Sequence, residues 1–323
     1  MTALLEVKEL VVEFPASKGR RVHAVSGVDF EVRQGETLGL VGESGCGKSS
    51  LARAIVQAPR PTSGSVVFDG TALEGLSRSA LREQRRRLQL IIQDPIAALN
   101  PRRKVEDIVA EPLELWGEGR RSYRQDRVAE VLDAVGIDLA AVAGRRASEF
   151  SGGQCQRINI ARALVLEPEL LVCDEPVSAL DVSVRAQIVN VLEGMKERYG
   201  LTMIFVGHDV SVVRNISDRI AVMYLGKIVE LGPADAVCER PQHPYTRALL
   251  DAVLEPGDVA PPPSLVPTEG IDLPSPFDPP SGCRFRTRCP MATDLCREVE
   301  PPLRVLGSGH VAACHHLDVV VAS

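Results

Sequence analysis

The sequence predicts an α/β protein with a parallel central sheet, and three observations support this fold class. Short apolar runs alternate with longer helical patterns along most of the chain, which is typical of strands joined by helices. One apolar run, Thr37–Val41, leads into residues 42–50, which fit the phosphate-binding pattern G-x-x-x-x-G-K-[ST]. A helical pattern follows at Ser50–Val56. In such a fold the functional loops lie at the carboxyl ends of the parallel strands.

The other strands are predicted from alternating or continuous apolar residues. Leu4–Phe14 alternates apolar and polar residues, and a second strand follows at His23–Val32. Gly64–Gly70 predicts a short strand that ends at an Asp-Gly turn. Further strands are expected at Leu88–Gln93, Leu170–Cys173 and Thr202–Val206, and a hairpin is expected from Ile220–Tyr224 and Lys227–Leu231.

Helical periodicity fills the segments between these strands. Helices are expected at Leu76–Arg87, from Ser151 to about Glu167, and at Val184–Tyr199. The stretch 94–150 shows mostly helical periods and many charges, so it predicts a helical subdomain inserted between two strands of the core. We expect this domain to span residues 1–253.

The chemistry of phosphate binding explains the residue types in this loop. The loop consists of Gly42, Glu43, Ser44, Gly45, Cys46, Gly47, Lys48, Ser49 and Ser50. Glycines let consecutive backbone N–H groups turn toward one phosphate, and a helix start adds unbonded N–H groups and the positive end of its dipole. Lys48 supplies positive charge for the β- and γ-phosphates, and the Ser49 hydroxyl is a ligand for Mg²⁺. The alternative, an incidental glycine-rich turn, leaves the flanking strand and helix unexplained.

Polar residues at the ends of three other strands suit the same nucleotide site. Asp174 can hold Mg²⁺ and Glu175 can polarise the attacking water, although the two could also be a surface acidic pair. Gln93 can reach the metal or that water. His208 can contact the γ-phosphate and position the water, whereas taken alone it suits a structural histidine better. Phe14 can stack on an adenine ring or pack in the core.

A second small glycine-rich loop stands at a predicted helix start. It consists of Ser151, Gly152, Gly153 and Gln154. Its backbone N–H groups, its hydroxyl and the helix dipole suit another phosphate contact. One chain would then carry two phosphate-binding surfaces, which need not serve the same nucleotide within a single subunit.

Composition narrows the function classes. The net charge is −6, so nothing demands a nucleic-acid partner. No apolar run reaches the roughly 18 residues needed to span a bilayer, and the N-terminus shows no signal-peptide pattern. We therefore expect a soluble, cytosolic protein whose membrane role, if any, comes through partners.

The order of the motifs resembles the ATP-binding cassette of ABC transporters over residues 4–253. The matching pieces are the phosphate loop, Gln93-Asp94-Pro95, Phe150–Gln154, Leu171–Pro176, Ser178–Asp181 and His208-Asp209. The resemblance implies a P-loop NTPase fold with a RecA-like parallel core sheet, an N-terminal antiparallel β part and an inserted helical subdomain. It also implies a head-to-tail dimer that holds ATP between the phosphate loop of one cassette and Ser151–Gln154 and Asp181 of the other. Glu175, His208, Gln93 and Lys48 are then the catalytic residues, with Mg²⁺ on Ser49, Gln93 and Asp174.

Three local segments resemble the ATPases of oligopeptide/dipeptide importers, and the N-terminal half resembles their F-type member. The segments are 93–102, 175–181 and 243–250. The resemblance implies ATP-driven import of peptides at the cytoplasmic face of the cell membrane. Its implied partners are a second, D-type ATPase subunit, two membrane permeases and an extracytoplasmic peptide-binding protein. Nickel importers share these motifs, so nickel or another small solute is the alternative cargo.

The C-terminal part carries a cluster of cysteines. Residues 254–281 are rich in proline and predict an extended linker, and residues 282–323 predict a small extension with little core. Cys283, Cys289, Cys296 and Cys314 lie in that extension. Thiolates bind soft metals, disulfides are disfavoured in a reducing cytosol, and the spacing lacks the paired C-x2-C of a zinc ribbon. The extension resembles the cysteine-rich segment of peptide-importer ATPases, which implies a [4Fe-4S] cluster; zinc and free thiols are the alternatives.

The sequence argues against two other classes of function. A soluble ABC ATPase acting on DNA would carry a long coiled coil between its Walker motifs, and one acting on the ribosome would carry two cassettes; the sequence shows neither. A regulatory module that binds ATP without cleaving it would lack catalytic groups, whereas the positions of Glu175 and His208 are filled.

Overall fold

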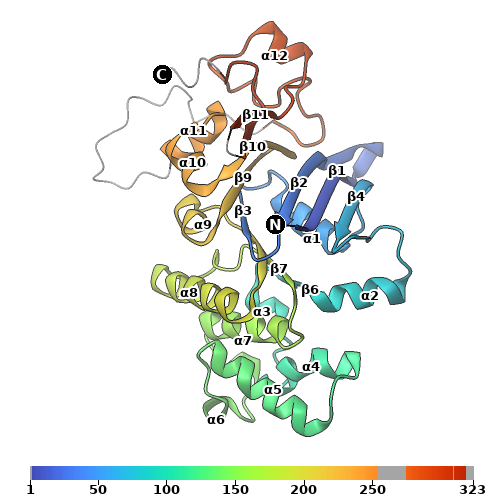
Figure 1. Ribbon diagram of the computed structural model, residues 1–323, viewed down its shortest axis with the longest axis vertical. Helices are drawn as coiled ribbons and strands as arrows, with labels where there is room; N and C mark the ends of the chain where they lie inside the picture. Colours follow the sequence, from blue (N-terminus) through green and yellow to red (C-terminus); the bar gives the residue numbers. More distant parts are fainter. Residues whose placement is uncertain (1, 253–273, 308, 318–323) are drawn as a thin grey trace. The chain divides into compact units, whose positions relative to one another are not determined.

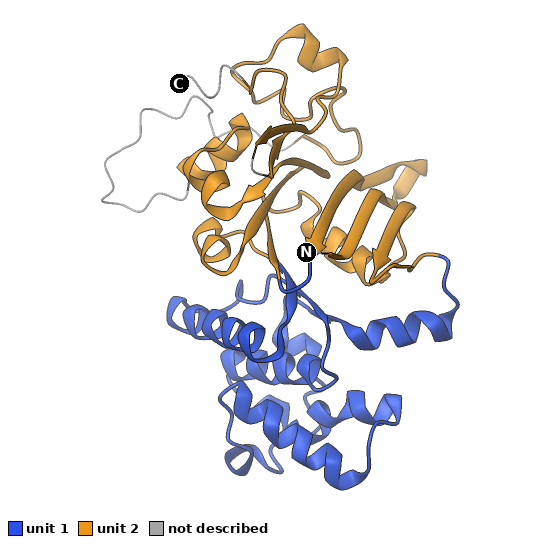
Figure 2. Cartoon of the chain, in the orientation of Figure 1, with its two compact units in different colours: residues 1, 33–35, 75–205 blue, residues 2–32, 36–74, 206–323 orange. Residues whose placement is uncertain are grey.

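The computed structural model describes residues 2–252, 274–307 and 309–317 (Figure 1). These residues form two compact units (Figure 2). Unit 1 contains residues 33–35 and 75–205, and unit 2 contains residues 2–32, 36–74 and 206–317 with the gaps just given. Most of the predicted linker, residues 254–273, lies outside the described residues.

Unit 2 begins with an antiparallel sheet. Its strands are β1 (Ala3–Pro15), β2 (Arg21–Arg33), β4 (Ser63–Phe68) and β5 (Thr71–Ala72), in the order β2-β1-β4-β5. The alternation read from the sequence is real, because Leu5, Val7, Leu10 and Val12 of β1 are all buried. The predicted antiparallel β part is therefore present, and the register of β1 with β4 pairs Leu5 with Phe68.

The second sheet in unit 2 contains the strand that leads into the phosphate loop. The strands, in the order β11-β12-β10-β9-β3, are β3 (Thr37–Val41), β9 (Arg219–Tyr224), β10 (Lys227–Pro233), β11 (Arg304–Gly307) and β12 (His310–Ala312). β3 and β9 are parallel, and β9 and β10 form the predicted hairpin. All five residues of β3 are buried, which explains why this strand is a continuous apolar run.

The helices of unit 2 pack around these strands. They are α1 (Lys48–Ile55), α9 (Val210–Ile216), α10 (Ala234–Glu239), α11 (Pro244–Asp251) and α12 (Asp294–Glu298), with a short 3-10 turn η1 at Ser17–Gly19. α1 begins at Lys48, two residues before the predicted start at Ser50. The lysine of the phosphate loop therefore belongs to the first turn of the helix.

The cysteine-bearing extension differs from the sequence expectation. It was expected to have little core, yet β12 pairs with β10 through Glu230–Ala312 and Leu231–Val311. Ala312, Cys314 and Leu317 form a buried cluster. An unpaired edge of β10 would expose a row of N–H and C=O groups, and the extension satisfies that edge.

Unit 1 contains three strands and most of the helices. β8 (Thr202–Val206), β7 (Leu170–Asp174) and β6 (Leu88–Ile91) lie in that order, and β6 and β7 are parallel. The helices are α2 (Arg78–Arg87), α3 (Pro95–Ala98), α4 (Val105–Trp116), α5 (Arg121–Ala134), α6 (Leu139–Val142), α7 (Gly152–Leu164) and α8 (Val182–Tyr199), with a 3-10 turn η2 at Ala147–Glu149. The helical character predicted for 94–150 is confirmed by α3 to α6. None of the described helices is long and apolar enough to cross a lipid bilayer.

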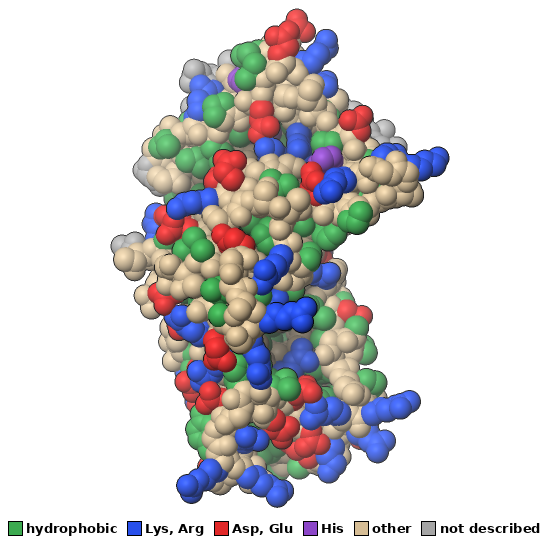
Figure 3. Space-filling model, turned by 90° about the vertical axis from the view of Figure 1, so that its right-hand side faces the viewer, with side chains coloured by type: hydrophobic (Ala, Val, Ile, Leu, Met, Phe, Trp, Pro, Cys, Tyr) green, Lys and Arg blue, Asp and Glu red, His purple; other side chains and the backbone are tan. Residues whose placement is uncertain are grey.

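Charged side chains of both signs lie on the surface. Figure 3 shows Lys and Arg side chains interspersed with Asp and Glu on the face that it draws. Many of them pair: Arg87 of α2 binds Glu169 with its Nε at 2.6 Å, and Arg214 of α9 binds Asp235 at 2.9 Å. The basic run at the end of α2 is thus partly neutralised by a neighbouring acid.

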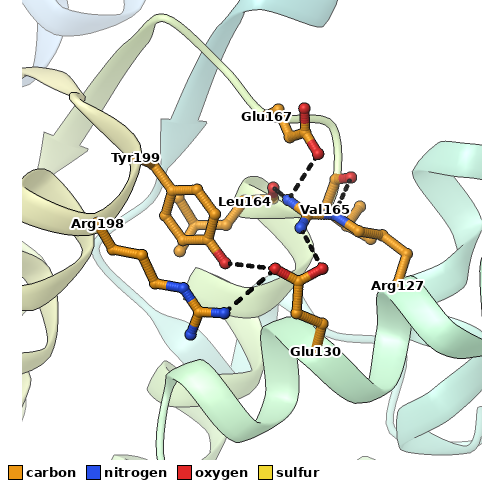
Figure 4. Close-up of polar contacts among 7 residues, drawn as sticks. All are labelled: Arg127, Glu130, Leu164, Val165, Glu167, Arg198 and Tyr199. Atoms are coloured by element: carbon orange, nitrogen blue, oxygen red, sulfur yellow. Dashed lines mark hydrogen bonds and ion pairs between the residues drawn. The ribbon is translucent and has the colours of Figure 1, made fainter.

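One buried arginine joins the helical subdomain to the end of α7 (Figure 4). The side chain of Arg127, in α5, is only 5% exposed. Its Nη1 donates to Glu130 at 2.7 Å, and its Nη2 donates to the carbonyl oxygen of Leu164 at 3.2 Å. Tyr199 and Arg198 donate to the other oxygen of Glu130. α5, the C-terminus of α7 and the end of α8 therefore share one polar network.

Candidate nucleotide-binding site

The phosphate loop connects β3 to α1 in unit 2, and two of its glycines are required by their surroundings. Gly42 has φ 151° and Gly47 has φ 111°. A Cβ on Gly42 would lie 2.1 Å from the carbonyl oxygen of Met223, and one on Gly47 would lie 2.0 Å from that of Ala24. Any side chain would collide with backbone at both positions, so the loop keeps its shape only with glycine.

Lys48 is the buried charge of the loop. It is 4% exposed, and its Nζ donates to the carbonyl oxygens of Gly42 at 2.8 Å and Glu43 at 3.1 Å. Cys46 is buried beside it, and burial raises the pKa of its thiol. Ser44 and Gly45 are exposed, and Ser49 and Ser50 are half-buried at the start of α1. The ammonium thus lies under the loop, where phosphate oxygens can replace the carbonyls as its partners.

Two further predicted residues belong to unit 2. Phe14 lies near the end of β1 and is half-buried. His208 is exposed and follows β8. The preceding Gly207 donates its N–H to the carbonyl oxygen of Leu40 at 3.0 Å, and the following Asp209 caps α9 by accepting from the N–H groups of Ser211 and Val212. The bond from Gly207 therefore ties the histidine segment to β3, and the bonds to Asp209 fix the start of α9.

Unit 1 brings Gln93 and Glu175 together, as the sequence suggested. β6 and β7 are neighbours with Ile91 opposite Cys173, so the residues that follow both strands meet. Gln93 Nε2 donates to Glu175 Oε2 at 2.8 Å. Asp174 ends β7 and is fully buried. Glu175 has φ 50°, a conformation that costs a non-glycine residue of order 1 kcal/mol and is concentrated at functional sites.

The second glycine-rich loop also lies in unit 1, at the N-terminus of α7. Ser151 caps the helix: its Oγ accepts from the N–H of Gln154 at 3.3 Å, and Gln154 Oε1 accepts from the N–H of Ser151 at 3.0 Å. A Cβ on Gly153 would lie 2.6 Å from Val184 Cγ1, so glycine allows α7 and α8 to approach closely. Gly152 is half-buried.

Asp181 is the N-cap of α8. It accepts from the hydroxyl of Ser183 at 2.7 Å and from the N–H of Val184 at 3.0 Å. These hydrogen bonds, that from Ser183 most, lower the pKa of its carboxyl. The carboxylate is therefore charged at neutral pH and exposed at the helix start.

Two contacts to the phosphate loop were missed by the sequence reasoning. The hydroxyl of Tyr245, in α11, accepts the backbone N–H of Glu43 at 2.8 Å. Arg288, in the extension, binds both carboxylate oxygens of Glu43. In the sequence, residues 243–250 stand out only as a subfamily pattern, which does not indicate the contact of Tyr245 with the phosphate loop. Nothing local in the sequence joins residue 288 to residue 43.

Comparisons with known proteins agree with this geometry. The model of the ABC transporter family matches residues 25–178, and that of the oligopeptide/dipeptide transporter C-terminal region matches residues 229–296. The chain is 48% identical to the oligopeptide transport ATP-binding protein OppF of Salmonella typhimurium, over 98% of this chain and 96% of that protein. This chain belongs to the oligopeptide/dipeptide group of ABC transporter ATPases.

Solved cassettes share the fold of this cassette. The dimeric, post-hydrolysis structure of the ATP-binding cassette MJ0796 with ADP and Pi is similar with a TM-score of 0.65 at 27% identity, over 71% of this chain and 98% of that chain. The structure of cbiO1 from Clostridium perfringens, part of the ABC transporter complex cbiONQ, is similar with a TM-score of 0.65 at 28% identity, over 73% of this chain and 91% of that chain. The fold is that of an ABC cassette.

The four cysteines of the extension lie near one another. The N–H of Cys283 donates to the carbonyl oxygen of Cys296 at 2.8 Å. Burial, together with the neighbouring thiols, raises the pKa of Cys283 and of Cys289 to about 11. Cys314 accepts the N–H of His316 at 3.3 Å. Within the described part of the chain, no group of three or more His, Cys, Asp or Glu is arranged to hold a metal ion.

Proposed function

We propose that this cassette binds and hydrolyses ATP to drive import of di- and oligopeptides through a membrane transporter. The observation that carries the proposal is the 48% identity to an oligopeptide transport ATP-binding protein over nearly the whole of both chains. The match includes the C-terminal region specific to oligopeptide/dipeptide transporters. Nickel or another small solute, the alternative cargo, is not favoured by these relatives.

The proposed roles follow the chemistry of each side chain. Phe14 stacks on the adenine, and the backbone N–H groups of Gly42–Ser50 with Lys48 bind the phosphates. Glu175 is the general base, the Gln93 amide holds its carboxylate, and His208 contacts the γ-phosphate. The Gln93–Glu175 hydrogen bond supports this pairing because it orients the Glu175 carboxylate.

Mg²⁺ suits the donor set of the proposed site. The Ser49 hydroxyl, the Asp174 carboxylate and the Gln93 amide oxygen are the hard oxygen ligands that Mg²⁺ prefers. Asp174 is fully buried at the end of β7, and a buried carboxylate is a suitable ligand for a metal ion. When bound, the ion neutralises charge on the phosphates during transfer.

ATP binding is proposed to close two cassettes on each other. Ser151–Gln154 and Asp181 then contact the nucleotide held by the partner cassette. The support for Ser151–Gln154 is that it forms a helix N-terminus, where backbone N–H groups and the helix dipole favour a phosphate. Closure converts ATP affinity into movement because ATP binds the closed state better and shifts its population.

In the proposed assembly, this cassette lies at the cytoplasmic face of the cell membrane as one subunit of an importer. Its partners are two permease subunits, an extracytoplasmic peptide-binding protein and a second ATPase of the D-type that forms a heterodimer with this chain. The helical subdomain of residues 94–150 is the proposed coupling surface toward the permeases.

A [4Fe-4S] cluster is proposed for Cys283, Cys289, Cys296 and Cys314, with zinc as the alternative. The support is that the four thiols lie within electrostatic reach of one another in a half-buried to buried setting. A cluster spreads its ligands around several metal atoms, so it does not need the tight grouping that one ion requires. A cysteine thiol gives up its proton when it binds a metal. Assay of iron and sulfide in protein purified without oxygen tests this; colourless, iron-free protein would contradict it.

The transport proposal is tested by peptide uptake. A strain lacking the gene is complemented with the wild type, with Glu175→Gln, or with the matched control Glu197→Gln on the exposed face of α8. Radiolabelled peptide should be taken up with the wild type and the control, and not with Glu175→Gln. Purified Glu175→Gln should bind ATP but not turn it over. Equal uptake with all three genes would refute the proposal.

A further inference from the structure

We propose that Arg288 positions the phosphate loop, so that the cysteine-bearing extension sets the nucleotide affinity of the cassette. The inference rests on the proposed nucleotide-binding role of the loop. Arg288 lies directly before Cys289, and its side chain is 3% exposed. Its Nη1 donates to Glu43 Oε2 at 2.9 Å and to Oε1 at 3.0 Å. Glu43 is the second residue of the phosphate loop.

The same loop residue is held at three points. Its side chain binds Arg288, its N–H donates to the Tyr245 hydroxyl at 2.8 Å, and its carbonyl oxygen accepts from Lys48 Nζ at 3.1 Å. Glu43 therefore contacts both Lys48, which is proposed to bind phosphate, and Arg288 of the extension. The covalent chain from Arg288 continues at once into Cys289.

An aromatic cluster fixes the orientation of this contact. The Arg288 guanidinium lies 5.8 Å from the ring centroids of both Tyr224 and Phe285, within the range of a cation–π attraction. The Tyr224 ring lies 4.6 Å from Tyr245 and 5.2 Å from Phe285. Tyr224 ends β9, Tyr245 belongs to α11, and Phe285 belongs to the extension, so three parts of unit 2 hold the arginine in place.

A held loop binds nucleotide better than a free one. A glycine-rich backbone has many accessible conformations, and part of the binding free energy is lost in ordering the loop into the one that binds the ligand. The contacts of Glu43 with Arg288 and Tyr245 order the loop before ATP binds, and so they reduce that cost. By thermodynamic reciprocity, nucleotide bound at the loop must in turn stabilise the Arg288 segment.

The first test measures the affinity for a fluorescent ATP analogue in four full-length variants. Arg288→Gln and Glu43→Gln should each weaken binding about tenfold, within the usual range of coupling between sites. The double variant should bind no more weakly than either single one. Arg288→Lys should recover part of the affinity because one nitrogen makes both contacts with Glu43. Unchanged affinity or additive losses would overturn the proposal.

A matched control separates positioning from loss of fold. Arg286 lies in the same extension, and its Nε donates to the carbonyl oxygen of Ser281 at 3.0 Å, away from the loop. Arg286→Gln should leave the affinity within about twofold of the wild type, as expected for a residue outside the coupled pair. An equal loss of affinity with Arg286→Gln would mean that any damage to the extension suffices, and the specific role of Arg288 would be wrong.

Hydrogen exchange distinguishes this inference from the proposed function. Without nucleotide, Arg288→Gln should speed amide exchange in residues 43–47 relative to the wild type, and Arg286→Gln should not. With a nonhydrolysable ATP analogue, residues 283–289 of the wild type should exchange more slowly. A wild type that binds no ATP would refute the nucleotide-binding role, whereas unchanged exchange at 43–47 in Arg288→Gln would refute the positioning role.

Discussion

Acid should destabilise unit 2 through one buried histidine. His243 is 1% exposed and caps α11: its Nδ1 accepts the N–H of Tyr245 at 3.0 Å, and its own backbone N–H donates to Glu230 at 2.8 Å. Burial lowers the pKa of its imidazole to about 4, against a smaller opposing effect of the Glu230 carboxylate. The native state therefore holds this histidine neutral, with its acceptor nitrogen committed to the helix cap.

The pKa values of His243 in the native and unfolded states set the direction and the size of its effect on stability. The unfolded chain binds a proton at His243 near pH 6.5, and the native state binds it only near pH 4. Falling pH therefore favours the unfolded state. The contribution to stability is fully present above pH 6.5 and is lost as the pH falls toward 4. At about 1.4 kcal/mol per pKa unit the total is roughly 3 kcal/mol, of which roughly 2 kcal/mol is lost by pH 5.

The assay is urea unfolding, followed by circular dichroism, of the wild type and His243→Asn at pH 7.5 and pH 5.0. Asparagine is a good N-cap residue that does not titrate, so any constant cost of the substitution cancels between the two pH values. The wild type should lose about 2 kcal/mol more than the variant on acidification. An identical loss in both proteins would show that His243 is not the titrating group, and the reasoning from its burial would fail.

Five other substitutions test the phosphate loop and the helical subdomain. Gly47→Ala should abolish ATP-analogue binding because its Cβ would lie 2.0 Å from a backbone oxygen, whereas Gly45→Ala, with nothing within 4 Å, should bind more weakly but measurably. Lys48→Ala should lose binding, and isothermal calorimetry that shows wild-type affinity would contradict the role of its ammonium. Arg127→Leu should lower the free energy of unfolding by about 2 kcal/mol, because it leaves carbonyls and a carboxylate without a buried donor. The half-exposed Arg198→Leu should cost less than about 1 kcal/mol, and urea titration followed by tryptophan fluorescence measures both losses.

Local patterns predicted the parts of this protein whose causes are local. The loop Gly42–Ser50 was recognisable because glycine spacing, a buried strand and a following helix all occur within a few residues. Gln93 and Glu175 were each predicted at the end of a strand, and they meet because β6 and β7 are parallel neighbours that bring their carboxyl ends to one edge. The hairpin of β9 and β10 is likewise a short-range feature.

The missed contacts all join distant parts of the sequence. Glu43 and Arg288 are 245 positions apart, and no periodicity encodes their ion pair. The extension was expected to have little core because it is short, whereas its pairing partner β10 lies before the proline-rich stretch. The helix α1 starts at Lys48, two residues before the start predicted from apolar spacing, because that spacing does not define the first turn of a helix.

The carboxylate of Glu230 has a consequence for how the gene can be shortened. It is fully buried in β10, where it accepts N–H groups from Gln242 and His243 and meets His310 Nε2 at 2.7 Å. Cutting the chain in the proline-rich stretch would remove that histidine and uncover the rings of Tyr224 and Tyr245. A cassette truncated in this way would expose aromatic rings and a carboxylate without its histidine partner beside the phosphate loop, so enzymatic measurements on it would not represent the intact protein.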